Sequence, residues 1–313
     1  MAGTGLPTLG RRQLFAAAAI AGLGLTMTPV HSANLPPDPF MPVPLPPLPS
    51  FKEGVAEIPD ARLYYRDFGG DGVPVVLMHP ATGSALMWGY QVPALVKAGY
   101  RVIAYSRRGY YGSDPADKAN GGHPSIDLLH LMDKLGIGKF AMVATAAGCT
   151  IALDFAMDHS GRLAGMVVSS GSYGNIAEPD YKRVNDAVIT KGFNEMPPEF
   201  RELGPSYRAA NFEGVKLWLE LEHQALSGNR AGPTNANKFT WANFARIKAP
   251  TLFIAGAADL YAPPPMMRLV ASHVPGAEMI VVPDSGHSVY WEQPDAFNQI
   301  AIDFLARVTD RNR

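Results

Sequence analysis

The feature that most restricts the fold of this chain is a repeated alternation of short apolar strands with helical segments. Apolar runs of strand length lie at 61–69, 74–78, 101–106, 139–145, 164–170, 251–256 and 278–283. Apolar residues at helical spacing lie between or after them, at 125–136, 264–274 and 294–308. Repeated strand–helix–strand units predict an α/β fold with a mainly parallel, twisted sheet and helices on both faces.

Composition excludes several classes of function. The 313 residues carry a formal net charge of −1, so no binding to nucleic acid or to an anionic membrane is expected. The single cysteine, Cys149, can form neither an internal disulfide nor a thiolate metal cluster. The sequence contains no zinc-type His/Cys spacing and no Gly-rich phosphate loop. We therefore expect no metal, no cofactor, and a small molecule as the partner, and oligomeric state stays open.

The N-terminal segment, residues 1–33, predicts an export signal. Arg11 and Arg12 precede an apolar run of about 16 residues, which resembles a twin-arginine signal and is shorter than the roughly 20 residues of a membrane-spanning helix. We expect export to the periplasm or the exterior, without stable membrane insertion of the mature chain. An uncleaved anchor and a disordered tail are the alternatives.

Two further segments interrupt the strand–helix rhythm. Residues 34–50 hold eight prolines in seventeen positions, which predicts an extended linker. Residues 173–243 contain no clear strand and indicate several helices joined by Pro and Gly turns, a candidate lid. The core is then expected at 51–172 and 244–313. The insertion also offers large apolar side chains for a pocket: Phe193, Met196, Phe200, Tyr207, Phe212, Trp218 and Leu219.

One short stretch, KFAMVATAAGCTIAL at 139–153, has the pattern of a nucleophile elbow. In such an elbow a strand ends in a strained turn that carries the nucleophile, and a helix follows at once. Small residues are required two positions before and two after the nucleophile, and Ala144 and Gly148 meet that requirement. The residue between them should be serine, but it is Ala146.

Four motifs in their expected order make the chain resemble the α/β-hydrolase family over residues 51–313. They are LMHPATGSALMW at 77–88, VIAYSRRGYYGSD at 102–114, the elbow VATAAG, and the pair GAADLYAPP and PDSGHSVYWEQP near the C-terminus. The resemblance implies a catalytic set of Ala146 at the nucleophile position, Asp259 as the acid and His287 as the base. It also implies that the backbone N–H groups of Ala81 and Ala147 form the oxyanion hole.

These residue types suit acyl transfer. A serine hydroxyl needs a base near neutrality, which imidazole supplies, and a carboxylate must orient that imidazole. Asp284 competes with Asp259 for the acid role but begins a turn. His79 is expected to be structural. Cys149 is expected to be a buried thiol, because as a nucleophile it would place the large Ile151 at a position for small residues.

Two accounts of Ala146 follow. In the first, the parent protein is a serine hydrolase that cleaves a hydrophobic or aromatic carboxylic ester through an acyl-enzyme, and this chain is a Ser-to-Ala form with almost no activity. The intact flanks and the presence of Asp259 and His287 favour this account. In the second, alanine is natural, and the chain is a non-hydrolytic binding protein or a serine-independent His/Asp base catalyst of the cofactor-free oxygenase type.

Overall fold

The computed structural model describes residues 44–116, 121–171, 173, 175–227 and 234–310. The export signal predicted at 1–33, and most of the 34–50 linker, lie outside these residues. The described part of the linker, 44–50, has no regular secondary structure. Across the described ranges no helix is long and apolar enough to cross a membrane. The same ranges hold no group of three or more His, Cys, Asp or Glu side chains suited to a metal.

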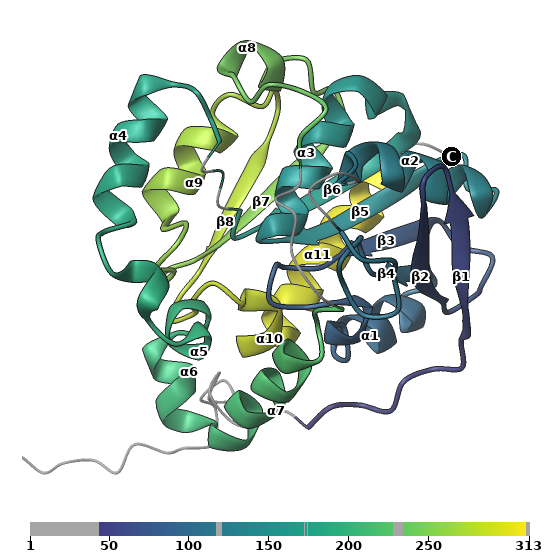
Figure 1. Ribbon diagram of the computed structural model, residues 1–313, viewed down its shortest axis with the longest axis horizontal. Helices are drawn as coiled ribbons and strands as arrows, with labels where there is room; N and C mark the ends of the chain where they lie inside the picture. The colour runs from purple at the N-terminus through teal and green to yellow at the C-terminus, as the bar shows by residue number, and fades with distance from the viewer. Residues whose placement is uncertain (1–43, 117–120, 172, 174, 228–233, 311–313) are drawn as a thin grey trace, which may run out of the picture. The chain divides into compact units, whose positions relative to one another are not determined.

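One eight-stranded sheet lies at the centre of the described chain (Figure 1). Its strands, in spatial order, are β1 (Lys52–Ile58), β2 (Ala61–Asp67), β4 (Arg101–Tyr105), β3 (Pro74–Met78), β5 (Phe140–Thr145), β6 (Leu163–Ser169), β7 (Thr251–Gly256) and β8 (Glu278–Val282). The strands from β4 to β8 are parallel, and β1 and β2 join one edge in antiparallel register. The predicted α/β fold with a mainly parallel sheet is confirmed.

Burial explains which strands the sequence predicts. Every residue of β5, β6 and β7 is buried, as expected for parallel strands covered on both faces, and each is a continuous apolar run. By contrast, β1 at the edge of the sheet is largely exposed and has the mixed sequence KEGVAEI. That strand was not predicted, because its pattern lacks the apolar run that marks the central strands.

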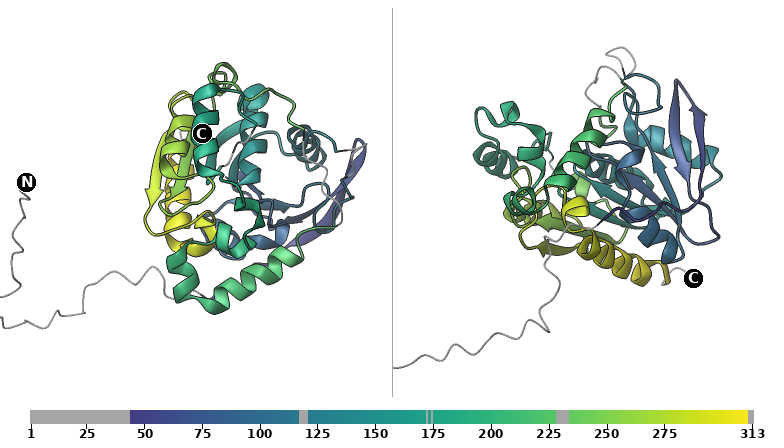
Figure 2. Two further views of the ribbon diagram at one scale, coloured as in Figure 1. Left: turned by 60° about the vertical axis from the view of Figure 1, so that its left-hand side comes forward. Right: turned by 90° about the horizontal axis from the view of Figure 1, so that it is seen from below.

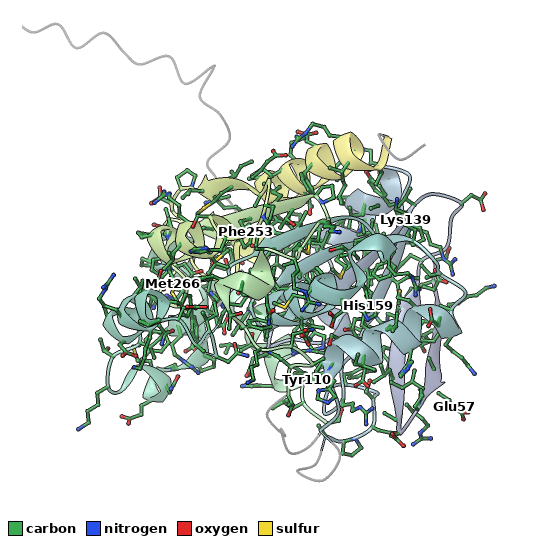
Figure 3. The ribbon with its side chains drawn as sticks, turned by 90° about the horizontal axis from the view of Figure 1, so that it is seen from above. Glu57, Tyr110, Lys139, His159, Phe253 and Met266 are labelled. Carbon is green, nitrogen blue, oxygen red and sulfur yellow. The ribbon has the colours of Figure 1, made fainter. Side chains whose placement is uncertain are left out.

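Helices cover both faces of the sheet (Figure 2). On one face α1 (Gln91–Lys97) packs on β4 and α11 (Pro294–Asp310) packs on β6. On the other face lie α2 (Pro124–Lys134), α3 (Ala147–His159) and α9 (Pro264–Ala271). Each face has its own apolar core. Phe253 of β7 and Met266 of α9, both labelled in Figure 3, belong to the core on the face covered by α2, α3 and α9.

The described residues of the insertion, 173–243, form helices joined by turns and irregular segments, and their one strand-like feature is an isolated bridge from Leu226 to Tyr110. Its longer helices, with α8 at its end, are α4 (Pro179–Val188), α5 (Pro198–Glu202), α6 (Pro205–Ala210), α7 (Phe212–His223) and α8 (Trp241–Phe244). A proline begins α4, α5 and α6, where the missing N–H costs nothing. Of its large side chains, Trp218 is buried, whereas Phe212 is 75% exposed and faces outward.

Short helical elements complete the described chain. They are η2 (Ala85–Met87), η3 (Ser160–Arg162), η4 (Phe193–Glu195) and α10 (Val289–Glu292). Because β3, β5, β6, β7 and β8 run in parallel, their carboxyl ends meet at one edge of the sheet. The loops with Ala81, Ala146, Asp259 and His287 all begin at that edge, which is where open α/β sheets bind ligands.

Candidate active site

The turn between β5 and α3 holds Ala146 in a strained conformation. Its φ of 50° and ψ of −117° are unusual for a residue other than glycine and cost on the order of 1–3 kcal/mol. The backbone fixes this conformation, since the Ala146 N–H donates to the Ser169 carbonyl at 3.0 Å and the Ala146 carbonyl accepts from the Cys149 N–H at 3.0 Å. The alanine side chain contributes nothing to these bonds.

Gly148 explains why this turn needs small residues. A Cβ atom at Gly148 would lie 2.2 Å from the carbonyl oxygen of Met78 and 3.1 Å from that of His79. Any side chain at 148 would therefore push α3 away from the end of β3. The contact brings the first turn of α3 against the loop that carries Ala81.

The two predicted oxyanion donors lie on either side of this contact. Ala147 is the first residue of α3, and the N–H groups of a first helical turn have no partner within the helix. Ala81 follows His79 and Pro80 at the end of β3, and both alanines are half-buried. Their positions agree with the oxyanion role, which stays a prediction.

His79 is held as a structural residue. Its ring nitrogen Nε2 accepts a hydrogen bond from the Arg107 N–H at 3.1 Å, and the Arg107 guanidinium donates to the Pro80 carbonyl at 2.9 Å. The ring of Tyr110, labelled in Figure 3, lies against the imidazole with centroids 4.5 Å apart. These contacts fix the loop before Ala81 and support the structural interpretation of His79.

Asp259 and His287 meet at the ends of β7 and β8. The imidazole Nδ1 of His287 lies 3.0 and 2.9 Å from the two carboxyl oxygens of Asp259, and both side chains are almost fully buried. The Asp259 Oδ1 also accepts hydrogen bonds from the N–H groups of Tyr261 and Ala262, at 2.8 and 2.9 Å. The carboxylate is therefore fixed from two sides and can orient the ring.

The electrostatics of the pair follow from its burial. Burial alone would lower the pKa of His287, but Asp259, Glu202 and Glu292 together raise it to about 9. Burial alone would raise the pKa of Asp259, yet His287 and the two backbone N–H groups bring it below its usual value. The pair thus favours the charged imidazole, which is how Asp259 would stabilise the imidazolium formed when His287 accepts a proton; the neutral imidazole that acts as the base becomes more populated as pH rises towards 9.

Three residues around His287 were not singled out from the sequence. The ring of Tyr261 lies against the imidazole with centroids 4.4 Å apart, and Phe193 of the insertion packs on Tyr261. Glu202 of α5 and Glu292 of α10 are buried carboxyl groups that act on the His287 charge. Tyr261 and Glu202 come from segments far from His287 in the sequence, and only the fold places them beside it.

The competing residues do not have the same setting. The Cys149 thiol is buried and donates to the Ser169 carbonyl at 3.1 Å, and burial raises its pKa, so it is not a ready nucleophile. Asp284 lies in the turn after β8 with a φ of 54°, and its side chain is exposed. The structure thus brings Asp259 and His287 into contact and leaves Ala146 two strands away along the same edge of the sheet.

Comparison with known proteins agrees with this geometry. A family model described as the alpha/beta hydrolase family matches residues 75–300. The chain belongs to the α/β-hydrolase family. A 2-hydroxy-6-oxononadienedioate/2-hydroxy-6-oxononatrienedioate hydrolase of Escherichia coli O81 (strain ED1a) is 27% identical over 278 residues, covering 79% of this chain and 91% of that protein.

Solved structures share the fold of this α/β-hydrolase. A thermophilic esterase from Thermogutta terrifontis has a TM-score of 0.64 at 24% identity, covering 82% of this chain and 99% of its own. An enol-lactonase from Burkholderia xenovorans LB400 has a TM-score of 0.65 at 23% identity, covering 81% and 100%. A bromoperoxidase from Bacillus anthracis has a TM-score of 0.64 at 23% identity, covering 82% and 100%. At these identities the likeness concerns the fold alone.

Proposed function

We propose that this hydrolase-family chain carries a serine-esterase site in which alanine occupies the nucleophile position. The observation that supports the proposal most strongly is the strained backbone at Ala146, with φ of 50°. That strain serves to present a nucleophile, and an alanine gains nothing from it. The buried Asp259–His287 pair is the second support, because it is the base and orienting acid that such a nucleophile needs.

With a serine at 146, each group has a definite task. The serine oxygen attacks the carbonyl carbon of the ester while His287 Nε2 takes its proton, and Asp259 holds the ring through Nδ1. The N–H groups of Ala81 and Ala147 stabilise the negative oxygen of the tetrahedral intermediate. His287 then protonates the leaving alcohol, and water attacks the acyl-enzyme by the same route. Without the serine oxygen, the chain should bind an ester but leave it almost uncleaved.

A hydrophobic or aromatic carboxylic ester is the substrate class we propose. Phe193 of the insertion reaches Tyr261, which lies on His287, so aromatic surface borders the base. The relative from Escherichia coli is named for hydrolysis of oxo-dienedioate compounds, and two of the similar folds are an esterase and an enol-lactonase. All are hydrolases, and the choice of ester rests on the apolar surroundings of His287.

Serine-independent base catalysis is the second candidate. It is favoured by one observation: the bonds between His287 and Asp259 involve no atom of residue 146. In that case the unmodified chain would consume oxygen with a ring hydroxy compound, and His287→Ala would abolish the uptake. Absence of uptake over a panel of such compounds would remove this candidate.

The deciding experiment restores the missing oxygen. The Ala146→Ser protein should hydrolyse short p-nitrophenyl esters at neutral pH, with turnover about a million-fold above that of the unmodified chain. The matched control adds His287→Ala to Ala146→Ser and should return the rate to background. If Ala146→Ser shows no activity over a broad ester panel, the esterase proposal is wrong and a binding protein becomes the better account.

A further inference from the structure

Glu202, the last residue of α5, carries a buried carboxyl group with an unsatisfied oxygen. The residue is 5% exposed, and its Oε2 atom has no hydrogen-bond partner among the described residues. Buried polar oxygens nearly always have a partner, because leaving one without a hydrogen bond costs free energy of folding. This carboxyl group therefore needs an explanation other than the stability of the fold.

Backbone contacts fix Glu202 beside the His287 loop. Its carbonyl accepts a hydrogen bond from the Ser288 N–H at 3.0 Å. The carboxylate of Glu292 accepts from the Gly204 N–H at 2.8 Å and from the Gly286 N–H at 2.9 Å. The insertion is thus bonded directly to Ser288 and is linked to Gly286 through the Glu292 carboxylate, so these bonds hold the end of α5 beside the His287 loop.

Three more buried polar groups belong to the surroundings of Tyr290, on which the Glu202 charge acts. The Ser288 Oγ, the Tyr290 hydroxyl and the Trp218 Nε1 make no hydrogen bond of good geometry in the described part of the chain, although the Trp218 and Ser288 side chains interact with the Tyr290 hydroxyl. Burial raises the pKa of Tyr290, the charge of the Glu202 carboxyl raises it further, and hydrogen bonding by the Trp218 and Ser288 side chains lowers it. Of these four groups, Glu202 carries the one carboxyl group.

Burial opposes a carboxylate at this position. Burial raises the pKa of Glu202, and Asp259 raises it further, while His287 acts in the opposite direction. An apolar side chain of similar size would avoid this cost, since an unsatisfied buried carboxyl group is worse than a packed hydrocarbon. A bound molecule that donates a hydrogen bond to Oε2 would remove the cost.

We propose that Glu202 determines substrate specificity by accepting, through Oε2, a hydrogen bond from a hydroxyl or amino group of the ester. The inference rests on the proposed function, since it places the ester against His287. Asp259 contacts this imidazole, the charges of Glu202 and Glu292 also act on it, and Tyr261 packs on its face. A substrate with an added carboxylate should therefore bind worse than one with a hydrogen-bond donor.

The test compares esters that differ only in that substituent, with the Ala146→Ser protein as enzyme. On the acyl side the series is ethyl phenylacetate and its α-hydroxy, α-methoxy and α-amino derivatives; on the alcohol side it is 2-hydroxyethyl and 2-methoxyethyl benzoate. In at least one series, kcat/KM for the hydroxyl or amino ester should exceed that for the methoxy ester by about tenfold to a hundredfold, the worth of a hydrogen bond to a charged group.

Variants of Glu202 assign the preference. The ratio of hydroxyl to methoxy ester should fall to about one in Glu202→Leu, and Glu202→Gln should keep part of it, because an amide oxygen still accepts a hydrogen bond. Glu199→Gln, on the same helix, is the matched control and should leave the ratio unchanged. Equal rates for the matched esters, or a preference that persists in Glu202→Leu, would overturn the proposal.

Two precautions keep the outcome decisive. If Glu202→Leu does not fold, as judged by its thermal unfolding, the drop of the ratio in Glu202→Gln decides instead, and an unchanged ratio there overturns the proposal. If Ala146→Ser hydrolyses no ester, the proposed function fails, and calorimetry on the unmodified chain takes over. Tighter binding of the hydroxyl ester that is reduced in Glu202→Gln supports the role of Glu202, and equal or absent binding, or a preference unchanged in Glu202→Gln, contradicts it.

Discussion

The two halves of the candidate site are built by different means. At the elbow, the geometry is set by the backbone. Main-chain hydrogen bonds hold Ala146 at positive φ, and Gly148 allows α3 to contact the end of β3. At the ends of β7 and β8, the geometry is set by side chains, since those of Asp259 and His287 are paired and buried. The first half presents an alanine, which has no nucleophilic atom, whereas the second half presents a paired carboxylate and imidazole.

This difference shows which half a single substitution can alter. A Ser-to-Ala change removes one oxygen, and no backbone bond at the elbow depends on that oxygen. Loss of Asp259 or His287 would instead leave a buried charged partner alone, which destabilises strongly. The elbow can therefore keep its backbone conformation without a nucleophilic side chain. The Asp259–His287 pair cannot lose one member without destabilising the fold.

The largest effect, on ester turnover, should come from disrupting the Asp259–His287 pair. In the Ala146→Ser protein, Asp259→Asn should lower ester turnover by about ten-thousand-fold, because the amide no longer holds the imidazole in the productive tautomer. Asp284→Asn, in the exposed turn after β8, is the control and should leave turnover nearly unchanged. Ester kinetics of the two variants side by side measure this, and equal losses would refute the assignment of Asp259.

A smaller effect should appear in the pH dependence of stability. The pKa of His287 is raised to about 9 from 6.5, so the charged imidazole stabilises the fold fully below its unfolded pKa, and this contribution is lost as pH rises through the folded pKa. Between about pH 6.5 and about pH 10, the unfolding free energy should fall by about 3 kcal/mol more in the unmodified chain than in His287→Gln.

Urea unfolding at several pH values checks this difference. Subtracting the His287→Gln curve removes the contribution of every group that titrates alike in both proteins. Parallel curves for the two proteins would mean that Asp259 does not stabilise the charged imidazole, which would contradict the electrostatic description of the pair.

The smallest effect concerns the backbone of the elbow. Gly148→Ala should lower the unfolding free energy by about 1–3 kcal/mol, because the new methyl group would lie 2.2 Å from the Met78 carbonyl oxygen. Gly161→Ala is the matched control, since a Cβ there meets nothing within 4 Å. Urea denaturation of both variants gives the comparison. A Gly148→Ala protein as stable as Gly161→Ala would contradict the close contact between α3 and β3.

Much of the fold and the half-sites could be predicted from sequence, because each rests on local pattern. The strands at 74–78 and 251–256 were predicted with their observed ends, since buried parallel strands are short apolar runs bounded by turns. The elbow at Ala146 was likewise visible from the spacing of small residues. Residues 1–33 remain a predicted export signal.

The surroundings of His287 could not be predicted, because they depend on contacts between distant segments. The bond between Gly204 and Glu292 joins residues 88 positions apart, and nothing near Glu202 in the sequence marks it as a neighbour of the base. The exposure of Phe212 could not be predicted for the same reason. Helical spacing indicates that a helix has an apolar face, but packing between segments decides which of its residues are buried.

The central claim is that position 146 is the nucleophile position of a serine-hydrolase site, and covalent labelling tests it most directly. A fluorophosphonate reacts with an activated serine oxygen, which displaces fluoride and forms a stable phosphonyl ester. Mass spectrometry of the digested Ala146→Ser protein should show one label, on residue 146. The unmodified chain and the Ala146→Ser protein with His287→Ala should stay unlabelled. Absence of the label, or a label on a neighbouring residue such as Ser285 or Ser288, would contradict the account.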